Sequence, residues 1–179
     1  EGPLQISNTI KGRLGDLRVI THSSIKNNEI RFRNFLKKGV GVMAAIELST
    51  RIERDKITIS PSNIHLYNSK VNFAGSVTRS PEQVVRLRIN TEPVHLVGWD
   101  NLLPDIVGYE IDGQLSAGLS VYKQLTPHEE IPILLGYLQL ANANAVSKIR
   151  GASNYEGIDI DVRFLGKEIE ILNFQMGAG

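Results

Sequence analysis

Apolar and polar residues alternate along most of this chain. Between residues 108 and 121, every second position is apolar or small and the positions between are mostly polar; the first set is Ile111, Gly113, Leu115, Ala117, Leu119 and Val121. A period of two is typical of a β-strand with one apolar and one polar face. The pattern returns at residues 4–14 and 157–176, without long helical segments between. The sequence therefore predicts a mainly β fold, a curved and mostly antiparallel sheet with one or two short helices.

Turn-forming residues divide the chain into the short runs of an antiparallel meander. Asn27 and Asn28 predict the turn of a hairpin, because asparagine tolerates left-handed backbone angles. Residues 40–52 are predicted as one long strand, with a helix as the weaker alternative. Three brief strands set off by Pro61 and Asn68 are expected at residues 57–59, 64–66 and 71–73.

Two segments carry helix signals. Ser80, Pro81 and Glu82 fit a helix start, but the alternation over residues 85–89 leaves room for at most one turn before a strand. In the second segment Trp99 and residues 102–103 fall at helical spacing, and Pro104 is expected to stop the run. A short helix there would cap an end of the sheet.

Composition narrows the classes of function. A length of 179 residues suits one β-rich segment, residues 1–179, without a second domain. Twenty Lys and Arg against nineteen Asp and Glu give a net charge of +1, which nominates neither nucleic acid nor an anionic membrane. The absence of cysteine excludes disulfides and thiolate chemistry. No apolar run reaches the roughly 20 residues of a membrane-spanning helix. Because the chain also starts without methionine or a signal peptide, we interpret it as a segment of a larger protein, with targeting information outside it.

Candidate catalytic residues do not form a convincing set. The four histidines lie singly along the chain, so no metal site is expected; they are His22, His65, His95 and His128. Paired carboxylates that could serve a glycosidase alternate with isoleucines, which makes them the polar face of a hairpin; they are Asp159, Asp161, Glu168 and Glu170, with Arg163 and Lys167 as expected partners. We predict no enzyme and no cofactor. A hydrolase stays a third hypothesis, which would need these carboxylates to converge in a pocket with raised pKa values.

A basic stretch interleaved with aromatics occupies residues 31–38, with Arg31, Arg33, Lys37, Lys38, Phe32 and Phe35. Such mixtures can bind single-stranded nucleic acid. Here the aromatics fall where the buried face of a strand should be, so we predict no nucleic-acid partner. Contact with lipid headgroups or with a partner protein stays open.

The second half of the chain contains a recurring arrangement of leucine and glycine. The segment LVGWDNLLP is followed by GYEIDGQLSAGLSV, a linker with prolines, GYLQLANANAV and a closing hairpin; the positions that carry the pattern are Leu102, Leu103, Pro104, Gly113, Leu115, Gly136, Leu138, Leu140, Gly166, Gly177 and Gly179. It resembles the AsmA-like family of bacterial envelope proteins. The likeness is strongest over residues 71–179 and is one of general character before that.

The resemblance implies a large periplasmic protein, anchored in the inner membrane through a segment outside this chain. Its implied role is outer-membrane biogenesis and phospholipid transport between membranes, with phospholipid and envelope or outer-membrane proteins as partners. AsmA-like proteins are similar in architecture to bridge-like lipid transfer proteins, in which a curved sheet lines an apolar groove. No catalytic residue or cofactor is needed for such a role.

Seven residues are predicted to face inward, either against lipid or in a packed core: Ile111, Leu115, Leu119, Ile158, Ile160, Val162 and Phe164. Alternating strands also build ordinary sandwiches. A structural or adhesive β scaffold with a dry core and no lipid role is therefore the alternative.

Overall fold

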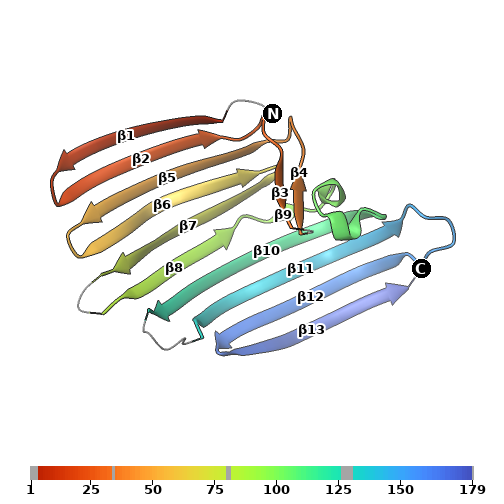
Figure 1. Cartoon of the computed structure of the whole chain (residues 1–179). Coiled ribbons are helices and arrows are strands. Elements are labelled where there is room, and N and C mark those ends of the chain that lie inside the picture. The colour runs from red at the N-terminus through yellow and green to blue at the C-terminus, as the bar shows by residue number, and fades with distance from the viewer. Residues whose placement is uncertain (1–3, 34, 80–81, 126–130, 179) are drawn as a thin grey trace.

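A single antiparallel sheet forms most of the molecule (Figure 1). The computed structural model describes residues 4–33, 35–79, 82–125 and 131–178. Ten strands lie in the order β1-β2-β5-β6-β7-β8-β10-β11-β12-β13, and β9 pairs with β10 beside this path. The prediction of a mainly β, antiparallel fold is confirmed.

The strands lengthen toward the second half of the chain. The first five are β1 (Gln5–Arg13), β2 (Asp16–Ser24), β5 (Ala44–Glu53), β6 (Lys56–Leu66) and β7 (Ser69–Thr78). The next five are β8 (Val84–Thr91), β10 (Tyr109–Gln124), β11 (Ile133–Ser147), β12 (Tyr155–Gly166) and β13 (Glu168–Ala178). β9 is Val94–His95, and β3 (Ile30–Phe32) pairs with β4 (Leu36–Lys38) in a separate hairpin.

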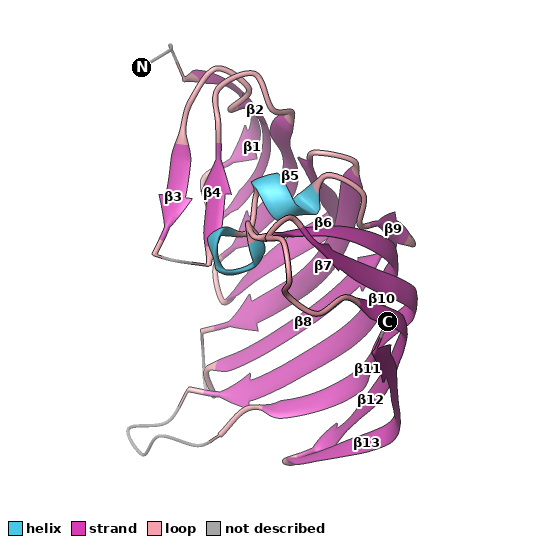
Figure 2. Cartoon of the chain, turned by 90° about the vertical axis from the view of Figure 1, so that its right-hand side faces the viewer, coloured by secondary structure: helices cyan, strands magenta, loops and turns pink. Residues whose placement is uncertain are grey.

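The sheet is bent, and the remaining elements lie on its concave side. Figure 2 shows the β3–β4 hairpin and two short helices on one side of the curved sheet. These are 3₁₀ helices, η1 (Trp99–Asn101) and η2 (Pro104–Ile106). They lie at one end of the strands, as expected for the segment around Trp99, but Pro104 begins η2 instead of only ending a helix. Its fixed φ and missing N–H suit a first helical position.

Two predictions for residues 27–52 are wrong. The chain turns near Asn27 and Asn28, but the strands on either side, β2 and β3, do not pair. The hairpin forms one turn later, where Arg33 adopts a positive φ of 50°. The predicted strand over residues 40–52 begins only at Ala44, and the helical alternative is not formed.

Pro61 does not separate two strands. The two runs around it form the single strand β6, and Pro61 sits where the β6–β7 register shifts between the pairs Ile59–Gly75 and Ser62–Phe73. A bulge of this kind tolerates proline because the ladder is already interrupted. The strand predicted after residues 80–82 is β8, while Ser80 and Pro81 lie outside the described residues, as do His128 and Gly179.

Close approach between β10 and β11 requires glycine at position 136. Gly136 has a φ of 152°, and a Cβ built there would lie 1.9 Å from the carbonyl oxygen of Gly118. A side chain can be accommodated only if the strands separate locally.

We predict that Gly136→Ala lowers the free energy of unfolding by on the order of 1–3 kcal/mol, because the new methyl group collides with backbone. The matched control is Gly39→Ala, where the Cβ would meet nothing within 4 Å. Its expected effect is within about 0.5 kcal/mol. Urea unfolding followed by circular dichroism measures both, and equal midpoints would contradict the prediction.

Candidate ligand-binding groove

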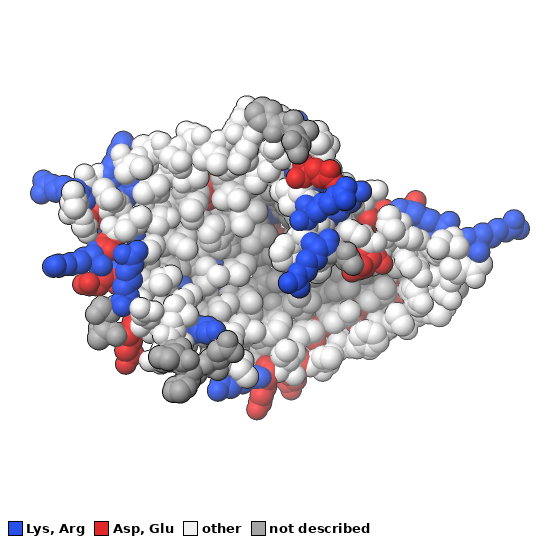
Figure 3. Space-filling view, viewed as in Figure 1, with Lys and Arg blue, Asp and Glu red and all other residues white. Residues whose placement is uncertain are grey.

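The concave face of the sheet is almost free of charge. Residues paired across antiparallel strands share a face, so one row can be followed across nine strands: Ile10, Val19, Thr50, Ile59, Gly75, Leu87, Val121, Leu134 and Gly166. Among the paired strand positions of this face in the described chain, Lys123 is the one charged residue. Figure 3 shows the same face as a hollow surface whose Lys, Arg, Asp and Glu side chains gather at the rim and over the β3–β4 hairpin.

The convex face has the opposite character. The adjacent row, one residue along each strand, reads Lys11, Arg18, Arg51, Thr58, Ser76, Arg86, Tyr122 and Ile133. Charged residues occur on this face on every strand of the ten except β11. Arg51 pairs with Asp16 at 2.8 Å, and this hydrogen-bonded ion pair lowers the pKa of Asp16 and raises that of Arg51. The sheet therefore separates an aqueous face from an apolar one.

No second layer covers the apolar face over most of its extent. The buried apolar residues of the described chain are few and dispersed: Ala44, Val84, Val94, Leu102 and Ala143. A packed sandwich or barrel would bury a contiguous set of large side chains. The concave face is thus an open groove bounded by the ends of the strands.

All seven residues predicted to face inward lie on the concave face. Leu115 on β10 opposes Leu140 on β11, which opposes Ile160 on β12. In a second row Leu119 opposes Gly136, which opposes Phe164. Ile111, Ile158 and Val162 belong to the same face by their registers. Each of the seven is half-buried.

The same face continues across the first half of the chain, where the prediction named no site residues. Ile46 opposes Ile64, which opposes Val71, and Phe73 opposes Ile89. The sequence of the first half shows the same alternation of apolar and polar residues, which could have identified these positions. The bulge in β6 between Ile59 and Ser62 hides the phase of this alternation, because one extra residue exchanges the two faces in the sequence pattern.

The β3–β4 hairpin is fixed over one side of the groove, at the ends of the strands. The ammonium group of Lys38 anchors the hairpin. Lys38 is fully buried and donates to the carbonyl oxygens of Lys26 (3.3 Å), Asn28 (2.6 Å) and Gly39 (3.1 Å). Burial lowers the pKa of Lys38. The backbone N–H of Lys37 also donates to the carbonyl oxygen of Leu102, at 2.8 Å. The hairpin and the 3₁₀ helices are therefore coupled.

The 3₁₀ segment is itself held by polar and aromatic contacts. The indole N–H of Trp99 donates to Asn68 Oδ1 at 2.7 Å, and its ring meets Tyr67 edge-on at 6.4 Å between centroids. Asp100 is buried and accepts from Lys148 Nζ at 2.5 Å. These contacts join the segment to both halves of the sheet and close the groove at this corner.

The candidate catalytic residues do not assemble. Asp159, Asp161, Glu168 and Glu170 all lie on the convex face of the β12–β13 pair. Arg163 opposes Glu170 on this face, close to the carboxylates as expected, but neither Arg163 nor Lys167 forms an ion pair within the described chain. No group of three potential metal ligands occurs among the described residues. His22 and His65 lie on the convex face as well.

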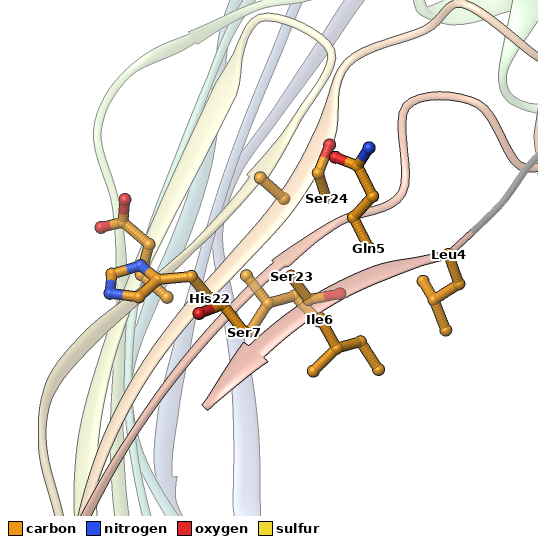
Figure 4. A pocket seen from close by; sticks show the side chains of 10 residues that line it. Leu4, Gln5, Ile6, Ser7, His22, Ser23 and Ser24 are labelled. Carbon is orange, nitrogen blue, oxygen red and sulfur yellow. The ribbon is translucent and has the colours of Figure 1, made fainter. Parts of the chain in front are cut away.

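The hollows of the surface are open. One of about 550 Å³ lies at one end of the neighbouring strands β1, β2 and β5 and takes its lining from both faces of the sheet. Figure 4 shows its residues, with Ile6 leaving β1 in one direction and His22 leaving β2 in another. Their registers agree, since Ile6 opposes Ser23 while His22 opposes Ser7. Its lining holds no cluster of reactive groups.

Comparisons with family models, with curated proteins and with solved structures found no match to this chain. Within the described residues, no helix has the length and apolar character needed to cross a membrane.

We predict that Lys38→Met releases the hairpin, because the carbonyl oxygens of Asn28 and Gly39 lose the ammonium donor, at a cost of about 1–3 kcal/mol, while that of Lys26 keeps the N–H of Gly41. Hydrogen exchange should show faster exchange at the amide of Lys37, with the amides shared by β10 and β11 unchanged. Lys37→Met is the matched control, since its side chain is exposed. Equal protection of the hairpin in both variants would contradict the anchoring role of Lys38.

Proposed function

We propose that the concave face binds the acyl chains of phospholipids and lets them pass along the groove, as a segment of an AsmA-like protein of the bacterial envelope. The observation that carries this proposal is the concave face itself, which crosses the ten strands with Lys123 as the one charged residue among its paired positions in the described chain and with no protein layer over most of it. The AsmA-like resemblance supports a periplasmic groove that is anchored to the inner membrane from outside this chain and has a role in outer-membrane biogenesis.

The groove has suitable dimensions for such a ligand. Nine spacings of about 4.8 Å between ten strands give an apolar track of roughly 43 Å. The acyl chains of one bilayer leaflet fill about 15 Å, half of the ~30 Å hydrocarbon core. The track can therefore take lipid chains in series. Each methylene removed from water contributes about 0.8 kcal/mol, so even partial cover by acyl chains is favourable.

The scarcity of charge on the concave face favours movement over tight retention. Apart from Lys123 near the end of β10, the paired positions of this face in the described chain offer a headgroup no ion pair, so the headgroup stays at the rim or in water. The rim offers cations on the hairpin, where Arg31 opposes Lys37 across the two strands. Glu29 pairs with Arg31 at 2.5 Å, and this pairing lowers the pKa of Glu29. No step of such transport requires a catalytic group.

The alternative function is a structural or adhesive scaffold without lipid. Large apolar side chains stay exposed on the concave face, which favours the lipid role; among them are Ile10, Ile64, Ile171 and Phe174. A scaffold that worked in water would gain solubility from polar residues at these positions.

We predict that protein purified from a bacterial host carries phospholipid. The double variant Leu115→Asp with Ile160→Asp should lower the amount of bound phospholipid at least about tenfold. The two carboxylates would enter a face where a charge costs about 2.5–3.5 kcal/mol against hydrocarbon. Native mass spectrometry with lipid extraction measures the bound fraction.

The control uses the adjacent convex row, in which Ser116 opposes Gln139 and Gln139 opposes Asp161. Ser116→Asp adds a carboxylate one residue from Leu115 and should leave bound phospholipid unchanged. Folded wild-type protein without lipid would favour the scaffold. Equal loss in the control and in the groove variant would show that binding does not use the concave face.

A further inference from the structure

Both edges of the sheet present an unpaired strand. Within the described chain β1 pairs only with β2, and β13 pairs only with β12. Every residue of both strands is exposed, and large apolar side chains are among them: Ile6, Ile10, Ile169, Ile171, Phe174 and Met176. Such edges are templates for a further strand, because their outward N–H and C=O groups have no ladder partner.

The two edges complement each other in charge. On the convex face, β1 ends in Lys11 and Arg13, and β13 begins with Glu168 and Glu170. None of these four residues joins an ion pair within the described chain. Figure 1 shows that the last residues of β1 and the first residues of β13 lie at the same side of the sheet.

The two edge strands also match in direction and in the orientation of their faces. Nine antiparallel steps separate β1 from β13, so the two strands run in opposite directions. A second copy displaced across the strands would therefore place its β13 antiparallel to β1 of the first, as at every other junction of the sheet. We propose that copies of this chain associate in this head-to-tail manner, with β13 of one copy added to β1 of the next.

The pattern of the strands selects a register. With Arg13 opposite Glu168, Lys11 falls opposite Glu170 and Ile10 opposite Ile171. The two charged pairs then share the convex face, and the isoleucines share the concave face. Ile10 is 63% exposed and Ile171 is 67% exposed, so this pairing covers two of the most exposed apolar side chains.

Beyond that point β13 has one extra residue, Leu172, at its register shift against β12. The shift keeps Phe174 and Met176 on the concave face, where Asn8 and Ile6 meet them. The apolar face thus continues from copy to copy, and the contact forms whether or not lipid is bound. A heterologous contact of this kind does not close on itself and builds open chains of copies.

The test is sedimentation velocity on the whole chain from about 5 to 200 µM at low ionic strength. We expect the sedimentation coefficient to rise with concentration, and the rise to weaken in 1 M salt, where screening shortens to about 3 Å. Two charge-reversed proteins sharpen the test: Lys11→Glu with Arg13→Glu, and Glu168→Lys with Glu170→Lys. Each alone places like charges at the junction and should weaken association at least about tenfold.

Mixing the two reversed proteins in equal amounts should restore association, because each then offers the edge that the other needs. The matched control for Lys11→Glu with Arg13→Glu is Lys56→Glu with Arg88→Glu, which makes the same change in net charge away from both edges and should associate as the wild type does. Circular dichroism confirms that every variant keeps its strands.

Wild-type protein that stays monomeric at 200 µM would overturn the proposal and leave the edges to another occupant. Association that survives both reversals, or that mixing does not restore, would overturn it by showing that the contact lies elsewhere. Sedimentation does not measure bound lipid, so a negative result here contradicts the association of copies and leaves the lipid-binding proposal to its own test.

Discussion

The whole molecule depends on the backbone ladder between antiparallel strands. With almost no contiguous core, the described chain cannot draw its stability from side chains packed between layers, as sandwiches do. Stability comes instead from hydrogen bonds along ten strands and from cross-strand pairs on each face, such as Leu115 with Leu140. A one-residue slip would move an entire apolar set into water, so the register is under strong constraint.

The bulges show how this constraint is met. Where β10 reaches Gly113, β11 inserts an extra residue at Asn142 and Ala143, and the apolar residues on both sides of the bulge stay on the same face.

The additions to the sheet stiffen one end of it. The hairpin, the 3₁₀ helices and Lys148 are joined by Lys38, by the Lys37–Leu102 hydrogen bond and by the Asp100–Lys148 ion pair. Two of the four buried polar residues of the described chain, Asp100 and Lys38, lie at this corner. The opposite ends of the strands carry no comparable cap among the described residues. The concave face is therefore covered along one side, at these strand ends, and is open over the rest of its described extent.

The sequence predicted the parts of this structure that depend on local pattern. Alternation over residues 109–121 and 158–171 was enough to foresee β10, β12 and β13 and to assign their faces, and all seven named residues share the concave face. The hairpin at Asn27 and Asn28 was predicted wrongly because turn propensity does not reveal which strands pair. Chain continuity favoured β2 with β3, whereas β2 pairs with β5 across the inserted hairpin. The Lys38 anchor could not be foreseen, since its acceptors are backbone oxygens brought together only by the fold.

The groove changes character along its length, and this bears on how a lipid would occupy it. Toward β2, β5 and β6 the concave face includes the hydroxyls of Thr21, Ser23, Thr50 and Ser62 among its aliphatic residues. Toward β12 and β13 it carries isoleucine, valine and phenylalanine with almost no polar atoms. Hydroxyls hold water and weaken the gain from covering the surface, while the aliphatic end gives the full gain per unit area. Acyl chains would thus be held more strongly near β12 and β13 than near β2. The difference is a shallow gradient without a charged trap, because the single cation of the floor, Lys123, lies near the end of β10 instead of in the middle of the track.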